Sequence, residues 1–217
     1  IFTARRSGLN DMTITTQLNN PKTIEEYEPL VAIYNQVWFD HPGTVDEWQH
    51  NDKQWPDTHL FQRFMVHFDR TLVAEGAIME SRWAHVSGKY GFGYSLPPAY
   101  EAIESDGRTN QDAIYDFVLD YLSERNPIAL QTWTREDKTV YMDWLAANGF
   151  QQTMRYAESA LDVPSFDFSR FDGVRERVAE SGIEILQLSD LQSRDPDWAR
   201  KAYDMCEEIE HDIPSPD

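Results

Sequence analysis

A chain of 217 residues can hold one substantial domain and part of a second. Hydrophobic residues make up 41% of it and aromatic residues 13%, which supplies an ample core and excludes wholesale disorder. The formal net charge of −19 argues against nucleic acid and anionic membranes as partners, because binding them needs clustered Lys and Arg.

The excess of acidic residues has two interpretations: a well-solvated surface, or a source adapted to high salt. The second is suggested by the low share of Lys, which makes up only five of the 19 basic residues. No apolar run approaches the roughly 18 residues that a membrane-spanning helix needs, and no basic and apolar leader is present. A single cysteine, Cys206, excludes an intramolecular disulfide framework and fits a reducing compartment. We therefore expect a cytoplasmic protein.

The first part of the chain predicts a strand followed by two helices. Residues 1–11 lack periodicity and are set aside as an N-terminal arm or a remnant before the natural start. Alternating polarity predicts a strand over residues 13–18. A capping-box pattern then begins a helix that ends near residue 38 and that Pro29 kinks or splits, and a second helix covers residues 45–54.

The next part predicts three strands and a binding unit. Residues 61–68 and 71–83 are rich in β-formers on either side of a short turn, which is typical of a hairpin, and residues 90–96 form the following strand. A loop then leads into a helix whose apolar residues recur at helical spacing: Ile114, Phe117, Val118, Tyr121 and Leu122. A loop that enters a helix N-terminus places free N–H groups where an anion such as phosphate can bind.

The remainder predicts a strand over residues 128–134 and a helix over residues 135–148, started by Thr134 and Asp137 as a capping box. Four residues of this helix are expected to be buried: Val140, Tyr141, Trp144 and Leu145. Two short strands follow within residues 151–163. Beyond a linker with a helix, residues 164–182, we expect a strand over residues 183–188 and a helix over residues 196–209.

Two segments resemble motifs of the GCN5-related N-acetyltransferases. In that family a strand leads through Arg-Gly-x-Gly-x-Gly/Ala into a helix, and here Asp106-Gly107-Arg108-Thr109-Asn110-Gln111 occupies those six positions. The stretch Trp-Leu-Ala-Ala-Asn-Gly-Phe at residues 144–150 is similar to the family signature Leu-Tyr-Glu-Lys-x-Gly-Phe. The resemblance implies an α/β (α+β) fold over residues 12–163, with a mixed, mostly antiparallel twisted sheet flanked by helices on both faces.

The resemblance also implies acetyl transfer from acetyl-CoA, as co-substrate, to a small-molecule amine or a peptide. For acetyl-CoA it implies backbone contacts from Tyr94, Ser95 and Leu96 and a phosphate-binding loop with Gly107, Arg108, Thr109, Asn110 and Gln111. Candidate bases are Glu75, Glu80 and His85, each of which could instead be a surface or structural residue. Tyr141 is the candidate acid, with an ordinary core residue as the alternative.

Three departures from the family pattern bear on activity. Asp106 places a negative charge where the family has Arg, and Thr109 and Gln111 place side chains where it has small residues. Leu145 occupies the position of a Tyr that protonates the leaving thiolate. These departures favour a second hypothesis, a non-catalytic binding or dimerisation module that kept the fold.

The strand and the helix predicted after residue 182 have the same order as the strand and helix predicted at the start of the chain. Residues 183–217 are therefore predicted to start a second, incomplete acetyltransferase-like domain, in a tandem arrangement similar to mycothiol-synthase-like proteins. A homodimer is a further hypothesis. The six histidines never occur at i, i+4 or His-x-His spacing, so no metal site is predicted.

Overall fold

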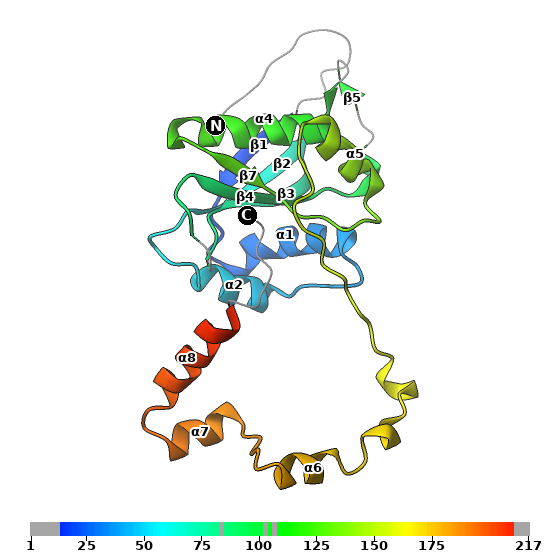
Figure 1. Ribbon diagram of the computed structural model, residues 1–217. Coiled ribbons are helices and arrows are strands. Elements are labelled where there is room, and N and C mark those ends of the chain that lie inside the picture. The colour runs from blue at the N-terminus through cyan, green and yellow to red at the C-terminus, as the bar shows by residue number, and fades with distance from the viewer. Residues whose placement is uncertain (1–13, 83–84, 102–103, 106–107, 211–217) are drawn as a thin grey trace. The chain divides into compact units, whose positions relative to one another are not determined.

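The computed structural model describes residues 14–82, 85–101, 104–105 and 108–210 (Figure 1). The chain divides into two compact units, residues 1–144 and 145–217, which are described separately. Within the described ranges, every helix falls short of the length or the apolar character that crossing a membrane requires.

The first unit is built on a five-stranded sheet in the order β1-β2-β3-β4-β7. All neighbouring strands are antiparallel except β4 and β7, which are parallel. Its strands are β1 (Ile14–Asn19), β2 (Phe61–Phe68), β3 (Thr71–Met79), β4 (Lys89–Ser95) and β7 (Ala129–Gln131), and a separate pair is formed by β5 (Glu104–Ser105) and β6 (Arg108–Thr109). The predicted fold class, a mixed and mostly antiparallel sheet, is confirmed.

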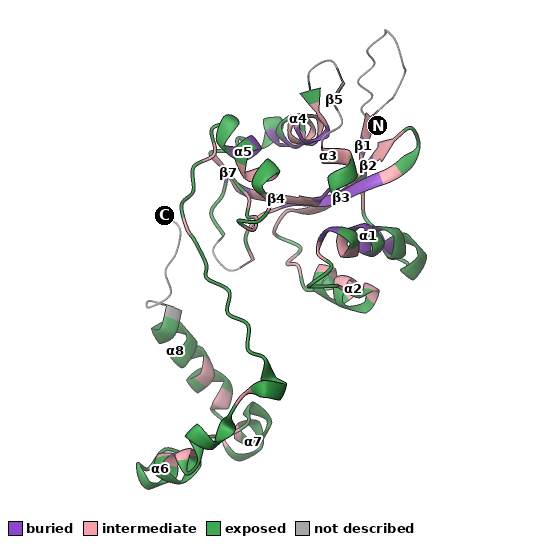
Figure 2. Ribbon diagram, turned by 90° about the vertical axis from the view of Figure 1, so that its right-hand side faces the viewer, coloured by how far each residue is buried: buried purple, intermediate pink, exposed green. Residues whose placement is uncertain are grey.

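Helices cover both faces of this sheet. The helices are α1 (Ile24–Val37), α2 (Val45–Lys53), α3 (Pro98–Glu101), α4 (Asn110–Leu122), the 3₁₀ turn η1 (Ser123–Arg125) and α5 (Thr139–Ala147), which continues into the second unit. Helices α1 and α2 lie on one face and α4 on the other (Figure 2). The layers enclose a core in which Leu30, Phe64, Ile78 and Ile114 are fully buried.

Local sequence explains how these elements begin and turn. A capping box starts α1 at Thr23, as predicted, and another starts α2 at Thr44. The β2–β3 hairpin turns through two residues with positive φ, Asp69 and Arg70. Pro29 lies inside α1, which is one uninterrupted helix from its cap, so the expected split of this helix is wrong.

Gly76 allows β3 to pass close to its neighbours. A Cβ at this position would lie 2.3 Å from the ring of Phe64 and 2.6 Å from the carbonyl oxygen of Gly93. The Phe64 ring packs in turn against Phe117 of α4, with 5.6 Å between centroids. Only glycine leaves room for this arrangement.

The predicted strand and helix before residue 148 are both too long. The strand β7 covers only Ala129–Gln131, and α5 begins at Thr139 instead of residue 135. The side chain of Asp137 binds the guanidinium of Arg135 at 2.8 Å, so the expected capping box does not form. Val140 is 53% exposed, which corrects its predicted burial, whereas Trp144 and Leu145 are buried.

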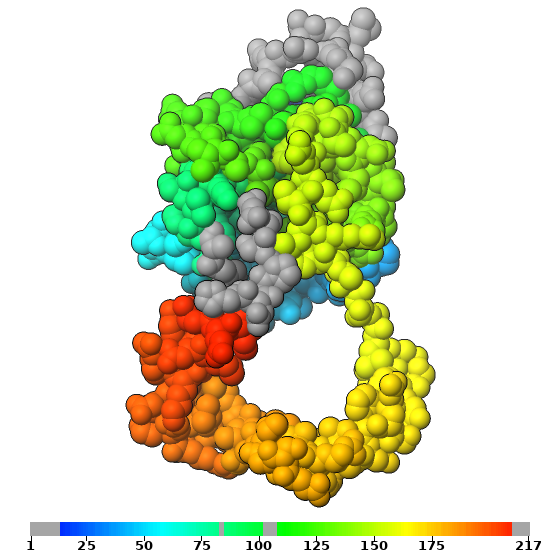
Figure 3. Space-filling view, in the orientation of Figure 1, coloured from blue at the N-terminus to red at the C-terminus, as the bar shows by residue number. Residues whose placement is uncertain are grey.

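The second unit contains short helices without a core of their own. They are the 3₁₀ turns η2 (Val163–Ser165) and η3 (Phe168–Phe171) and the helices α6 (Val174–Glu180), α7 (Leu188–Arg194) and α8 (Trp198–Glu210). None of the described side chains from residue 146 on is buried. In the space-filling view, the residues of α6, α7 and α8, coloured orange to red, form a thin curved band (Figure 3).

The strands predicted within residues 151–163 and over residues 183–188 are wrong. Neither segment pairs with another strand among the described residues. A strand needs a hydrogen-bonded neighbour and one buried face, and both segments are largely exposed. The division of the chain into an acetyltransferase-like domain, a linker and a second domain stays a prediction.

Candidate active site

The site forms where two neighbouring strands separate. Pairing between β4 and β7 ends at Gly91 and Gln131, although β4 continues to Ser95. On its other edge β4 stays paired with β3 up to Ser95, which lies opposite Glu75. A cavity of about 200 Å³ lies at this opening, between residues 93–96 of β4 and its end and residues 132–134 after β7.

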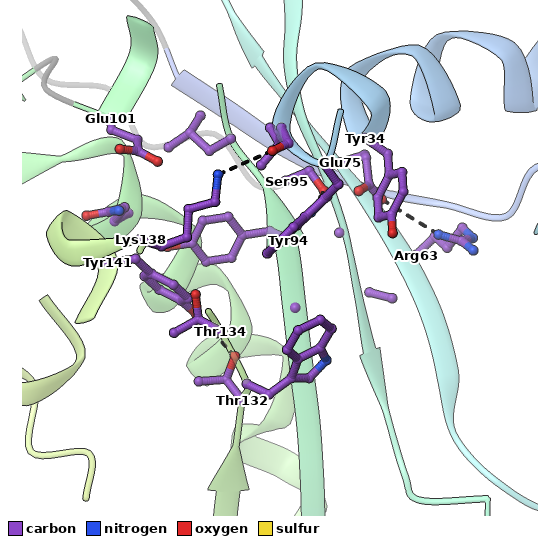
Figure 4. A pocket seen from close by; sticks show the side chains of 18 of the residues that line it. Tyr34, Arg63, Glu75, Tyr94, Ser95, Glu101, Thr132, Thr134, Lys138 and Tyr141 are labelled. Carbon is purple, nitrogen blue, oxygen red and sulfur yellow. Dashed lines mark hydrogen bonds and ion pairs between the residues drawn. The ribbon is translucent and has the colours of Figure 1, made fainter. Parts of the chain in front are cut away.

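The cavity is lined by side chains from both layers around the sheet. Those that carry a titratable or hydroxyl group, or an aromatic ring, include Tyr34 and Trp38 of α1, Trp48 of α2, Arg63 of β2, Glu75 of β3, Tyr94 and Ser95 of β4, Glu101 of α3, Lys138 and Tyr141 (Figure 4). All lining residues belong to the first unit.

Glu75 is the buried carboxylate of this cavity. Glu75 is 4% exposed. Burial raises the pKa of Glu75 to about 7, while the charge of Arg63 and a hydrogen bond with Ser95 act in the opposite direction. At neutral pH this side chain is therefore divided between its protonated and ionised forms.

Arg63 is a weak partner for Glu75 because another carboxylate holds it. Its Nε and Nη2 atoms each donate to Asp52 at 2.7 Å, whereas its Nη1 lies 3.7 Å from Oε2 of Glu75. The hydroxyl of Tyr27 also donates to Asp52, at 2.8 Å. The charge of Arg63 still acts to lower the pKa of Glu75, but the effect of burial outweighs it.

Ser95 is oriented toward Glu75 by an indole. The Nε1 of Trp38 donates to Oγ of Ser95 at 3.2 Å. Since this oxygen accepts from Trp38, its own proton is available for the carboxylate of Glu75, which accepts a hydrogen bond from it. Ser95 was predicted to contact acetyl-CoA, and its side chain belongs to the Glu75 network.

Two tyrosines close the side of the cavity near α5. The rings of Tyr94 and Tyr141 meet edge to face, with centroids 5.1 Å apart. The Tyr141 hydroxyl pairs with that of Thr132 at 3.2 Å. Burial raises the pKa of both tyrosines, so each keeps its proton at neutral pH.

Among the predicted base and acid candidates, Glu75 and Tyr141 line the cavity and the other two do not. Glu80 lies 3.3 Å from Nε2 of His85, and its other oxygen accepts from the backbone N–H of Leu60 at 2.7 Å. Burial acts to raise the pKa of Glu80, but the hydrogen bonds from Leu60 and His85 outweigh it and lower the pKa. Glu80 and His85 therefore stabilise the open end of the β2–β3 hairpin, where Leu60 precedes β2.

The start of α4, where the phosphate loop was predicted, is closed by the chain's own carboxylate. The N–H of Thr109 donates to Asp112 at 2.7 Å, and the N–H of Asp112 donates to Oγ1 of Thr109 at 3.2 Å. The other carboxylate oxygen of Asp112 accepts from Nε1 of Trp144 at 2.8 Å. This reciprocal cap occupies donors that a phosphate would otherwise use.

Two further predicted residues of this loop, Arg108 and Asn110, also have partners within the chain. Arg108 forms an ion pair with Asp116, and the buried Asn110 donates from Nδ2 to the carbonyl of Tyr100 at 2.7 Å. Gln111 is 2% exposed and lines the cavity, as do Tyr94 and Leu96. Gly107, together with Asp106, lies outside the described residues.

Sequence reasoning did not single out Asp52, Arg63, Trp38 or Lys138. A signal was available for one of them, because Arg63 stands among the aromatic and apolar residues of a predicted strand, as Glu75 does in the next strand. A charged residue in the middle of a buried strand needs a partner. Within the described ranges, no group of three or more His, Cys, Asp or Glu residues is placed to hold a metal ion.

Comparisons by sequence identify no relative: no model of a protein family matches the chain, and no curated protein does. Comparisons of structure identify the fold. An aminoglycoside N-acetyltransferase, AAC(6')-Iy in complex with CoA, superposes with a TM-score of 0.50 at 15% identity, over 70% of this chain and 97% of that chain. A protein assigned as a phosphinothricin N-acetyltransferase superposes with a TM-score of 0.50 at 13% identity, over 64% and 82% of the two chains. The chain therefore has the fold of the GCN5-related N-acetyltransferases, as the resemblance implied.

Proposed function

We propose that this chain is an acetyl-CoA-dependent N-acetyltransferase in which Glu75 is the general base. One observation carries the proposal: a fully buried carboxylate with a pKa of about 7 lines a cavity at the opening between β4 and β7. A base whose pKa lies near the working pH combines enough ionised form with enough proton affinity.

Acetyl-CoA would enter the opening beside β4. The edge of β4 beyond Gly91 is not paired with β7, so backbone groups of Tyr94, Ser95 and Leu96 are candidates to polarise the thioester carbonyl. The structural neighbour AAC(6')-Iy was solved in complex with CoA, which supports acetyl-CoA as the co-substrate of this chain.

The reaction then follows from the groups around the cavity. The acceptor arrives as an ammonium ion and transfers one proton to the carboxylate of Glu75. Its nitrogen attacks the thioester carbon and the N–C bond forms. The nitrogen then loses its second proton to water as the C–S bond breaks, which leaves the amide. The CoA thiolate takes a proton from the Tyr141 hydroxyl, or from water, and Glu75 and Tyr141 then exchange protons with solvent.

A second candidate function is a binding module without catalysis. The capping box at Thr109 and Asp112 favours it, because that carboxylate repels a pyrophosphate and occupies its donors. Leu145 in place of a tyrosine favours it as well. The tandem arrangement, the homodimer, the cytoplasmic location and a peptide acceptor remain predictions.

Measurements of acetyl transfer and of acetyl-CoA binding together distinguish the two candidate functions. We would incubate the chain with acetyl-CoA and a panel of primary amines and measure acetylated product by mass spectrometry, because the exposed Cys206 thiol interferes with thiol-reagent assays. Acetyl-CoA binding would be measured by calorimetry, with CoA as the comparison. Product formation supports the acetyltransferase. Absence of acetyl-CoA binding at millimolar concentration excludes it and leaves the binding module.

A further inference from the structure

The cavity has an aromatic wall on the side of α1 and α2. Tyr34 and Trp48 meet edge to face with centroids 5.3 Å apart, and Trp38 lies 5.8 Å from Trp133, which comes from the segment after β7. These four rings all line the cavity. Rings from separate elements thus surround the space above β3 and β4.

Rings of this wall already hold cations of the chain itself. The guanidinium of Arg63 lies over the Trp48 ring at 4.2 Å, and the ammonium of Lys138 lies 5.1 Å from the centre of the Trp38 ring. An aromatic face attracts positive charge through its quadrupole, most strongly when the site is dry. The wall is therefore compatible with positive charge nearby, and its apolar ring surface can contact the body of a cationic ligand.

The charges around the cavity favour a cation as well. Arg63 and Lys138 are its positive groups, and Arg63 is compensated by Asp52. Two further carboxylates, Glu75 and Glu101, line the cavity. Asp52 pairs with Arg63 without lining the cavity; when it is counted and Glu75 is ionised, three carboxylates accompany two cations around the cavity, and the local balance is negative.

The floor of the cavity is small and apolar. Ala77 of β3 lies opposite Gly93 of β4, and a Cβ added at Gly93 would meet no heavy atom within 4 Å. Gly93 does not have a positive φ, so its backbone can carry a side chain. The open space next to Glu75 is thus kept by the absence of a side chain at this position.

From this arrangement we propose that the acceptor is a primary amine carried on an apolar, flat body, such as an arylalkylamine. The ammonium group would lie at Glu75 and the body over Gly93, between the rings of Trp38 and Trp48. This inference rests on the proposed function, because it names the acceptor of the same site. An aminosugar fits less well, since its ring hydroxyls each need a hydrogen-bond partner that an aromatic wall does not supply.

Binding without acetyl-CoA tests the inference directly. We would titrate 2-phenylethylamine into the chain by calorimetry, with 2-phenylethanol as the uncharged probe and glucosamine as the amine without an apolar body. We expect 2-phenylethylamine to bind at least tenfold more tightly than either. Equal or tighter binding of 2-phenylethanol or glucosamine would overturn the inference.

A substitution at Gly93 locates the bound amine. Gly93→Val places its side chain in the open space, and we expect it to weaken 2-phenylethylamine binding at least tenfold. Gly91→Ala is the control in the same strand, because its added Cβ would meet only ordinary van der Waals neighbours, Met79 at 3.4 Å and the carbonyl oxygen of Gln131 at 3.9 Å. Thermal unfolding of both variants checks that they fold. Unchanged binding by a folded Gly93→Val would also overturn the inference.

The outcomes distinguish this inference from the proposed function. If 2-phenylethylamine binds and Gly93→Val removes the binding, but no acetyl group is transferred, the cation site stands and the acetyltransferase proposal fails. If acetyl transfer occurs with glucosamine and not with 2-phenylethylamine, the acetyltransferase proposal stands and the acceptor class is wrong.

Discussion

Asp112 at the start of α4 and Glu75 in β3 are both carboxylates of the first unit, and their surroundings differ. Asp112 accepts from the Thr109 N–H and the Trp144 indole, and although burial acts to raise its pKa, these hydrogen bonds lower it. Glu75 is buried with one hydroxyl donor and with a guanidinium nitrogen of Arg63 at 3.7 Å, and burial raises its pKa to about 7. A carboxylate supplied with N–H donors stabilises a helix, whereas one that lacks them remains available for proton transfer.

The sharpest test of this difference is the loss of the Glu75 carboxylate. In Glu75→Gln we expect the rate of acetyl transfer to fall by about 10²–10⁴, because general-base catalysis contributes that much. Steady-state kinetics of acetylated product with saturating acetyl-CoA would measure it. Glu80→Gln is the matched control, since Glu80 lies outside the cavity, and its rate is expected to stay within about twofold. A fully active Glu75→Gln would remove Glu75 from the mechanism.

The second test uses the pH dependence of stability. The pKa of Glu75 is raised from 4.5 to about 7, so the folded chain binds more protons than the unfolded chain in that window. The free energy of unfolding contributed by Glu75 therefore falls as pH rises from about 4.5 to 7, by up to about 3 kcal/mol in total.

Urea unfolding of the wild type and Glu75→Gln at pH 5 and pH 8 would isolate this contribution. Glutamine does not titrate, so we expect the variant to gain stability relative to the wild type at the higher pH. A difference between the two proteins that is the same at both pH values would show that Glu75 has an ordinary pKa.

The third test concerns the cap of α4. Thr109→Ala removes the acceptor of the Asp112 N–H, and we expect the free energy of unfolding to fall by about 1 kcal/mol. Asp116→Ala is a suitable comparison, since Asp116 lies on the exposed side of α4, where an ion pair contributes little. Equal effects of the two substitutions in denaturant unfolding would argue against a structural role for the cap.

The smallest expected effect is at Arg108. Its ion pair with Asp116 is exposed, with 47% and 54% of the two side chains accessible. We expect Arg108→Ala to change the KM for acetyl-CoA by less than about twofold and stability by less than about 0.5 kcal/mol. A tenfold rise in KM would instead mean that the start of α4 contacts the phosphates, and the contrast with the Glu75 cavity would have to be revised.

Elements that depend on local pattern were predictable from the sequence. The caps at Thr23 and Thr44, the turn at Asp69 and the apolar face of α4 are all encoded within a few residues. The start of α5 was not, because Arg135 pairs with Asp40, which lies 95 residues earlier in the chain. The strands expected beyond residue 150 failed for a related reason: apolar alternation does not provide a neighbouring strand.

The site was predictable only in part. Glu75 was a candidate from the resemblance, on the strand before β4, but its raised pKa depends on burial between α1 and the sheet, which the sequence does not show. The phosphate loop was placed from the resemblance, which aligned Thr109 to Gln111 with the motif. Nothing in that alignment indicated that Asp112 would turn back onto Thr109.

The burial of Glu75 also has an evolutionary consequence. A carboxylate held with so few donors lowers the stability of the fold above its pKa, so selection for folding alone would replace it with glutamine or an apolar residue. A descendant that no longer performs proton transfer is therefore expected to lose this acid early. Retention of Glu at this position among homologues would mark lineages in which the chemistry is still under selection.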